Sequence, residues 1–184
     1  KGMNTIDNDF IKNLFMTNTH HYIMFFTNTG RVYKLKCYEI PEASRTARGM
    51  AIINLLQLQP GEKITTMVHF ADFDEDRNLI MATKKGTIKK TPLSAYMNIR
   101  KTGIQAITLR DDDELIEVKV SDCEQNVLML TKKGQAIKFA EKDIRETGRS
   151  AMFSEAFSFF LLLHSLPDAV PAAPLQNKFL VRQS

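Results

Sequence analysis

The sequence contains only two cysteines among 184 residues, Cys37 and Cys123, and they stand far apart. Neither belongs to a Cys-x-x-Cys pair or to a cluster of cysteine and histidine, so no structural zinc site is expected. The two thiols could form a disulfide in principle. Because both flank strand-like sequence, we interpret them as buried free thiols in a reducing compartment.

The common catalytic motifs are also absent from the sequence. It has no Gly-x-x-x-x-Gly-Lys-[Ser/Thr] loop to hold a nucleotide phosphate and no Gly-x-Ser-x-Gly turn to expose a nucleophile. The acidic segment 72–76 lacks the glycine and the distal glutamate of an EF-hand loop. The neighbours His20 and His21 cannot both face one metal from a strand. We therefore expect no catalytic residue, no metal site and no cofactor in this chain.

Long apolar runs are scarce. The longest, at 157–163, is interrupted by Ser158 and is far too short to cross a bilayer. The first twenty residues are polar, unlike a secretory signal. We expect a cytoplasmic protein that has no contact with a membrane. Its hydrophobic content of 43% indicates a folded core, and its net charge of only +4 means that any argument for a polyanionic partner depends on where the charges lie.

The most informative feature present is a repeat. Two apolar residues, a threonine, two polar residues, a glycine and then an alternating basic segment occur at 25–34, 81–90 and 129–138. Glycine gives a tight hairpin the positive φ that it needs. The alternation, with Tyr33 and Leu35 on the face opposite Lys34, is typical of a strand. Each copy is predicted to form a β-hairpin.

A second element follows each hairpin: a turn that begins with arginine and ends with glycine. These turns lie at 45–49, 100–103 and 145–148. The first two units then continue with an apolar segment, a polar turn and a last strand. We expect the apolar segments to be strands at 51–55 and 106–109, the last strands to lie at 64–68 and 115–120, and a short helical turn at 94–99. Each unit therefore offers about four short strands in roughly fifty residues, the size of a propeller blade. A β-sandwich is the alternative that the pattern leaves open.

The repeats divide the chain into a blade region and a tail. Units at about 10–70, 75–122 and 123–152 predict an all-β pinwheel or propeller domain over 1–152, with about two and a half four-stranded blades. Residues 153–184 form an apolar, proline-rich tail without alternation. Because proline removes ladder donors and an uninterrupted apolar run cannot leave one face in water, we expect this tail not to complete the third blade.

Basic residues recur at two places in each unit, the hairpin and the arginine turn. Between Arg77 and Arg110 the sequence holds eight basic residues and no acidic one, whereas acidic residues cluster at 72–76 and 111–114. Repeated turns of this kind predict a periodic cationic rim, which suits the phosphate backbone of a nucleic acid bound with little sequence preference. The residues expected to contact phosphate are Arg31, Lys34, Arg45, Arg48, Lys84, Lys85, Lys89, Lys90, Arg100, Lys101, Lys132, Lys133, Lys138, Arg145 and Arg149.

Three segments resemble a known family. The segment 38–49, Tyr-Glu-Ile-Pro-Glu-Ala-Ser-Arg-Thr-Ala-Arg-Gly, is similar to the first blade of the C-terminal domain of DNA gyrase A subunits, as are 25–33 and 58–64. The resemblance covers residues 1 to about 152. The corresponding domain of topoisomerase IV A subunits is the second choice.

The resemblance implies a six-bladed β-pinwheel that wraps double-stranded DNA around its basic perimeter. It also implies an intact enzyme that contains a second A subunit, together with a B subunit that hydrolyses ATP, so that ATP and Mg²⁺ bind outside this fragment. The family's DNA-cleaving tyrosine lies in an N-terminal region outside this sequence. Its wrapping motif, Gln-Arg-Arg-Gly-Gly-Lys-Gly, would precede the fragment; Lys1 and Gly2 are either the last two residues of that motif or an unrelated match. We therefore expect neither strand cleavage nor ATP hydrolysis from this chain alone. The competing hypothesis is a propeller-like scaffold for protein interactions, which would show no DNA gel shift and no retention on heparin.

Overall fold

The computed structural model describes residues 11–44, 47, 49–73, 76–132, 134–149 and 179–182. Three hairpins form where the repeat predicts them, and the strand that follows each of the first two hairpins is also present. The strands are β1 (Tyr22–Thr27), β2 (Arg31–Lys36), β3 (Ile64–Phe70), β4 (Asn78–Thr83), β5 (Ile88–Pro92), β6 (Ile104–Gln105), β7 (Leu115–Ser121), β8 (Asn126–Leu130), β9 (Ala136–Ala140) and β10 (Phe179–Arg182). Four short 3₁₀ helices accompany them: η1 (Cys37–Glu39), η2 (Ile52–Asn54), η3 (Leu93–Tyr96) and η4 (Glu141–Asp143).

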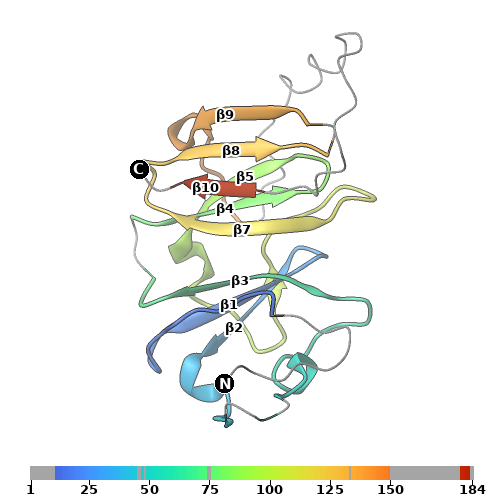
Figure 1. Cartoon of the computed structure of the whole chain (residues 1–184), viewed down its shortest axis with the longest axis vertical. Coiled ribbons are helices and arrows are strands. Elements are labelled where there is room, and N and C mark those ends of the chain that lie inside the picture. The colour runs from blue at the N-terminus through green and yellow to red at the C-terminus, as the bar shows by residue number, and fades with distance from the viewer. Residues whose placement is uncertain are drawn as a thin grey trace.

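The strands form three sheets that stack along the long axis of the molecule (Figure 1). The strand orders are β3-β1-β2-β6, β5-β4-β7 and β10-β8-β9. All the pairings within the sheets are antiparallel. The described residues contain no helix other than the 3₁₀ turns. The prediction of an all-β fold built from repeated small sheets is confirmed.

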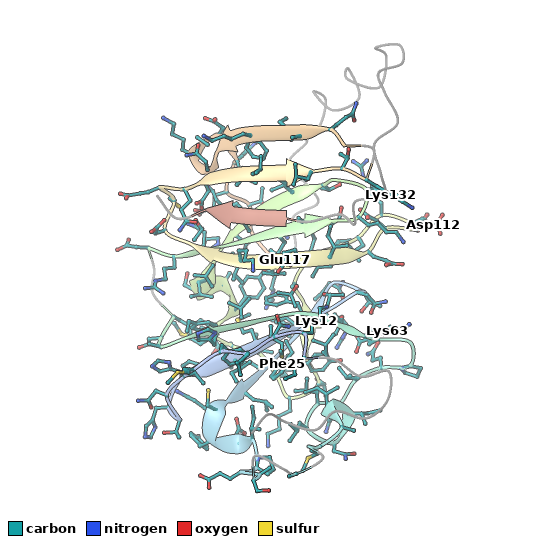
Figure 2. The ribbon with its side chains drawn as sticks, viewed as in Figure 1. Lys12, Phe25, Lys63, Asp112, Glu117 and Lys132 are labelled. Atoms are coloured by element: carbon teal, nitrogen blue, oxygen red, sulfur yellow. The ribbon has the colours of Figure 1, made fainter. Side chains whose placement is uncertain are left out.

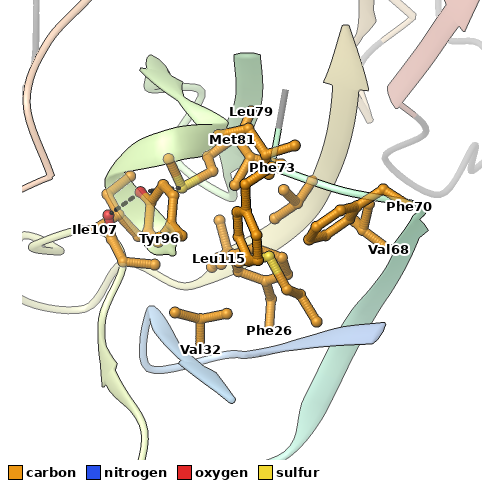
Figure 3. Close-up of a cluster of buried hydrophobic side chains, with 14 residues drawn as sticks. Phe26, Val32, Val68, Phe70, Phe73, Leu79, Met81, Tyr96, Ile107 and Leu115 are labelled. Atoms are coloured by element: carbon orange, nitrogen blue, oxygen red, sulfur yellow. Dashed lines mark hydrogen bonds between the residues drawn. The ribbon is translucent and has the colours of Figure 1, made fainter. Parts of the chain in front are cut away.

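The sheets pack face to face, so a central strand is buried on both sides. In β4, Leu79 and Met81 face the cluster shared with the first sheet, whereas Ile80 and Ala82 face the cluster shared with the third sheet. Figure 3 shows the first of these clusters, where Phe26 from β1 lies near side chains of β4 and β7. The period of two along each strand therefore sorts side chains between two cores, one on either side of the sheet.

The fourth strand of the first sheet belongs to the second unit. Strand β6 pairs with β2 through Arg31 opposite Gln105 and Val32 opposite Ile104. The backbone amides of Ala106 and Ile107 then both donate to the carbonyl oxygen of Gly30, at 2.8 and 3.2 Å. Consecutive units are thus interlocked by backbone hydrogen bonds as well as by apolar packing.

The two apolar segments after the arginine turns differ from the sequence prediction. Residues 51–55 are not a strand; they contain η2, and Ile52, Leu55 and Leu56 pack on the outer core of the first sheet. That spacing places them on one side of a helical turn. Residues 106–109 are not a strand either, because the ladder stops at Gln105. The short helical turn expected at 94–99 is present as η3.

The tail also departs from the prediction in one place. Strand β10, residues 179–182, pairs antiparallel with β8, opposite residues 126–129. In the same way, β3 pairs with β1 in the first sheet and β7 pairs with β4 in the second. These four residues therefore join the third sheet, although the sequence predicts that 153–184 does not complete the third blade. The rest of the predicted tail lies outside the described residues.

Two glycines of the repeat are required by their surroundings. Gly30 has φ +78°, and a Cβ there would lie 2.5 Å from the carbonyl oxygen of Ile107. Gly103 has φ +72°, and a Cβ there would lie 2.7 Å from the ring of Tyr33. Both glycines therefore allow the first hairpin to approach the segment 103–107 of the next unit closely.

Two further expectations from composition can be compared with the structure. The thiols of Cys37 and Cys123 are free, as predicted, but both residues are only half-buried rather than buried. Within the described residues, no helix is long and apolar enough to span a bilayer.

Candidate nucleic-acid interface

The hairpin tips and the turns that start β3 and β7 lie along one edge of the stacked sheets. Figure 2 shows Lys63, Asp112 and Lys132, one from each unit, at this edge. The first two tips are joined by a backbone hydrogen bond, which the amide of Leu115 in the second unit donates to the carbonyl of Asn28 in the first. The stacking of repeats therefore gathers turns that are distant in sequence into a continuous edge, as a periodic rim requires.

Arg31, the first basic residue of the hairpins, holds the next unit in place. Its guanidinium donates to the carbonyl oxygens of Thr102 and Gly103, at 2.7 and 3.3 Å, and its Nε lies 3.3 Å from a carboxylate oxygen of Glu62. The side chain is 21% exposed. Arg31 therefore links the first hairpin to the arginine turn of the second unit.

Glu62 is the buried partner of this arrangement, with a side chain only 1% exposed. It accepts hydrogen bonds from the Tyr33 hydroxyl at 2.6 Å, the Gln59 amide at 2.7 Å and the Thr29 hydroxyl at 3.0 Å. Burial alone would raise the pKa of Glu62, but these hydrogen bonds and the charge of Arg31 outweigh it, so the pKa is lowered. Burial and the hydrogen bond to Glu62 raise the pKa of Tyr33. The sequence pattern identifies residues 59–62 only as a turn and does not reveal this role.

Lysines four residues after the hairpin glycine have a shared structural function in the first two units. Lys34 Nζ donates to the carbonyl of Met97 at 2.5 Å, and Lys90 Nζ donates to the carbonyl of Glu141 at 3.3 Å. In both cases the acceptor lies in or beside the 3₁₀ helix of the following unit. Burial lowers the pKa of Lys34. The equivalent Lys138 is exposed.

Lys89 and Lys90 do not belong to the exposed rim that the sequence predicts, because both side chains lie in the interior. Lys89 is 0% exposed and Lys90 is 6% exposed. Lys89 Nζ donates to the carbonyl of Arg149 at 2.6 Å and to that of Ala106 at 3.4 Å. Burial, with a smaller contribution from the charge of Arg149, lowers the pKa of Lys89 to about 8. The sequence predicts that both lysines contact phosphate, and their contacts between units explain why they do not reach the surface.

The second hairpin carries exposed lysines, but an acidic turn lies against it. Lys84 Nζ is 3.5 Å from a carboxylate oxygen of Glu114, and Lys85 Nζ donates to the carbonyl of Asp111 at 2.7 Å. The backbone amide of Lys85 donates to a carboxylate oxygen of Asp113 at 2.9 Å. The segment that lacks acidic residues in sequence is therefore not free of them in space.

Exposed basic side chains remain at the second hairpin, at the second and third arginine turns and elsewhere on the third unit. Those from the predicted set are Lys84, Lys85, Arg100, Lys101, Lys132, Lys138, Arg145 and Arg149, whereas Arg31 and Lys34 are half-buried. Arg45, Arg48 and Lys133 lie outside the described residues. Lys12, Lys63, Lys119 and Lys142 are also exposed, and the repeat pattern did not select them. No group of three or more potential metal ligands occurs in the part of the chain that the structure describes.

Comparison with known proteins identifies this arrangement. A family model described as "DNA gyrase C-terminal domain, beta-propeller" matches residues 21–69, 77–122 and 125–152, one match for each sheet. The chain belongs to the DNA gyrase C-terminal domain family. The first two matches each cover a hairpin and the strand that follows it, whereas the third covers the hairpin of β8 and β9 but not β10. The likeness inferred from segments 25–33, 38–49 and 58–64 is therefore confirmed.

Individual relatives are DNA gyrase A subunits. The chain is 51% identical over 152 residues to the DNA gyrase A subunit of Clostridium acetobutylicum and 49% identical over 151 residues to that of Halalkalibacterium halodurans. These matches cover 83% and 82% of this chain but only 18% of each relative. The chain thus spans less than a fifth of the length of the curated relatives it matches.

Solved structures agree on the fold. A C-terminal domain of DNA topoisomerase IV superposes with a TM-score of 0.69 at 26% identity, and a DNA gyrase A C-terminal domain superposes with a TM-score of 0.61 at 28% identity. Each comparison covers 75% of this chain and 43% of the other. The matched region therefore makes up less than half of each of these solved domains.

Proposed function

We propose that this chain is the DNA-binding and DNA-wrapping part of a DNA gyrase A subunit. The observation that carries the proposal is the coincidence of two findings. The chain belongs to the gyrase C-terminal domain family over all three of its units, and exposed basic side chains occur at the second and third arginine turns and along the hairpin edge.

The chemistry of these positions supports duplex binding without sequence preference. Exposed lysine and arginine contact phosphate oxygens and release condensed counterions, which gives affinity that falls with salt. The aromatic side chains of Phe25, Phe26 and Tyr33 in the first hairpin are buried in the cores, so they are not available to stack on a base. A row of phosphate contacts along a stack of blades also favours bending, since a bent duplex reaches more of them.

The proposal extends to the whole enzyme. This chain would act in the cytoplasm beside the B subunit of gyrase, together with a second A subunit, in an assembly that introduces negative supercoils into DNA. ATP and Mg²⁺ would act at sites elsewhere in that assembly. In this arrangement the chain contributes binding and curvature rather than chemistry.

The test is a salt titration of duplex binding with two double variants. Lys101→Glu with Lys132→Glu changes exposed basic residues of the turn and hairpin, and Lys12→Glu with Lys119→Glu makes the same charge change elsewhere. We expect the first variant to weaken binding to all duplex sequences alike, more than the second does. If the parent chain shows no gel shift and no heparin retention at low salt, the proposal fails.

A further inference from the structure

A notch opens where the arginine turn of the second unit meets the end of the third. It has a volume of about 500 Å³ and is lined by residues 98–100 and 102–104 together with Arg149. Among these lining residues the charged side chains are those of Arg100 and Arg149, both exposed, and none is a carboxylate. The notch therefore has the charge and accessibility of an anion site.

A buried ammonium group lies against one wall of this notch. Lys89 is 0% exposed, and its Nζ is 2.6 Å from the carbonyl oxygen of Arg149, a lining residue. Its other hydrogen bond also goes to a backbone carbonyl, that of Ala106. No described carboxylate forms a salt bridge with it. A buried charge without a counter-ion is costly, and an anion in the notch would offset part of that cost.

The turn that forms the notch is held rigidly by the first unit. Arg31 donates to the carbonyls of Thr102 and Gly103, and the Gly103 backbone passes so close to Tyr33 that a Cβ would not fit. A site that is already in place before binding loses less entropy when the ligand arrives.

We propose that this notch binds one backbone phosphate of duplex DNA between the guanidinium groups of Arg100 and Arg149, with the Lys89 ammonium as a third positive charge behind them. The inference deepens the proposed function and rests on it. Arginine is suited to the role because its planar fork matches two phosphate oxygens. A polymeric phosphate is favoured over a free anion because both arginines are exposed, so a continuous strand can pass over the notch.

The first experiment measures duplex affinity against salt for the parent chain, for Arg100→Gln with Arg149→Gln, and for Lys119→Gln with Lys142→Gln as a control. The control removes the same charge from exposed positions outside the notch. Loss of one phosphate contact should lower the magnitude of the log–log salt slope by about 0.9 in the notch variant. Equal slopes for the notch variant and the control would overturn the notch while leaving the proposed function standing. A parent chain that does not bind duplex at all would overturn the proposed function itself.

The second experiment follows proton uptake at about pH 8 by calorimetry in buffers of different ionisation enthalpy. A phosphate beside Lys89 favours the charged form of its side chain, so duplex binding should take up protons. The uptake should be lost in Lys89→Met, and circular dichroism should show that this variant is folded. Uptake that persists in Lys89→Met contradicts the proposal. The same calorimetry with inorganic phosphate in place of duplex distinguishes the DNA backbone from free phosphate as the ligand. If millimolar free phosphate saturates the site as duplex does, a site for the DNA backbone is contradicted.

Discussion

The burial of Lys89 predicts an unusual dependence of stability on pH. Its pKa is about 8 in the folded chain, against an ordinary value of 10.5. Between these values the unfolded state binds more protons than the folded state, so the free energy of unfolding rises with pH. The group therefore lowers stability at neutral pH and ceases to do so as pH rises from about 8 to 10.5.

The size of this effect follows from the two pKa values. Proton linkage gives a gain in the free energy of unfolding of about 2 kcal/mol between pH 7 and about pH 9.5. The upper limit stays below the titration of tyrosine, because burial raises the pKa of both Tyr33 and Tyr96, and stability from those groups is lost above about pH 10. The window thus isolates the lysine.

The measurement compares urea unfolding of the parent chain and of Lys89→Met at both ends of this window, followed by far-ultraviolet circular dichroism. All other titrating groups are common to the two proteins, so the difference between their pH profiles reports Lys89. We expect the parent to gain about 2 kcal/mol on the variant across the window. Parallel profiles would refute the burial of a charged lysine between the second and third units.

The remaining predictions concern the first junction and the acidic turn. Gly103→Ala should lower the free energy of unfolding, measured in urea, by about 2–4 kcal/mol, because the positive φ is strained for alanine and the Cβ meets Tyr33. The control Gly61→Ala, whose Cβ meets nothing within 4 Å, should lower it by about 1 kcal/mol. Equal losses in the two variants would contradict the close approach of Gly103 to Tyr33. Glu62→Gln should lower stability at pH 7 by about 2 kcal/mol. Because the folded pKa of Glu62 is lowered, the stability that Glu62 provides is present above its ordinary pKa and is lost as pH falls through the folded pKa. The variant should therefore lose less stability in acid than the parent. An equal loss of stability in acid by both proteins would contradict this prediction. Glu114→Gln should raise duplex affinity about two- to threefold in low-salt gel shifts and have no effect at high salt, since it removes a carboxylate beside an exposed hairpin lysine; weaker binding would contradict the competition between that turn and DNA.

Local patterns in the sequence were enough to predict the hairpins. A threonine, two polar residues and a glycine specify a tight turn, and alternation specifies the strands on either side, so β1 with β2, β4 with β5 and β8 with β9 appear where expected. Segments 51–55 and 106–109 were misassigned because short apolar runs do not distinguish a strand from a buried turn. Residues 51–55 pack on the outer core of their own sheet, whereas Ala106 and Ile107 donate hydrogen bonds to Gly30 of the preceding unit. The local pattern contains neither contact.

Pairing between segments that are distant in sequence also explains why several residues of the predicted rim are buried or lie beside acidic groups. The sequence separates the basic stretch 77–110 from the acidic residues 111–114, but antiparallel pairing of β4 with β7 returns the acidic turn to the second hairpin. The network around Glu62 has no local signature for the same reason, since its partners Thr29, Arg31 and Tyr33 come from a strand pair about thirty residues earlier. In both cases a long-range register sets the electrostatics.

The equivalent lysines of the three units show that repeated position does not imply repeated exposure. Lys34 and Lys90 donate to carbonyls of the unit that follows, whereas Lys138 is exposed. A lysine bound to a backbone carbonyl inside a junction releases no counterion when DNA arrives, because it contacts no phosphate. A count of basic residues from the sequence therefore overstates the salt slope, and it does so by the residues that hold the units together. The slope measured for the parent chain should reflect the exposed set alone, and substitutions at Lys34 or Lys90 should change stability before they change the slope.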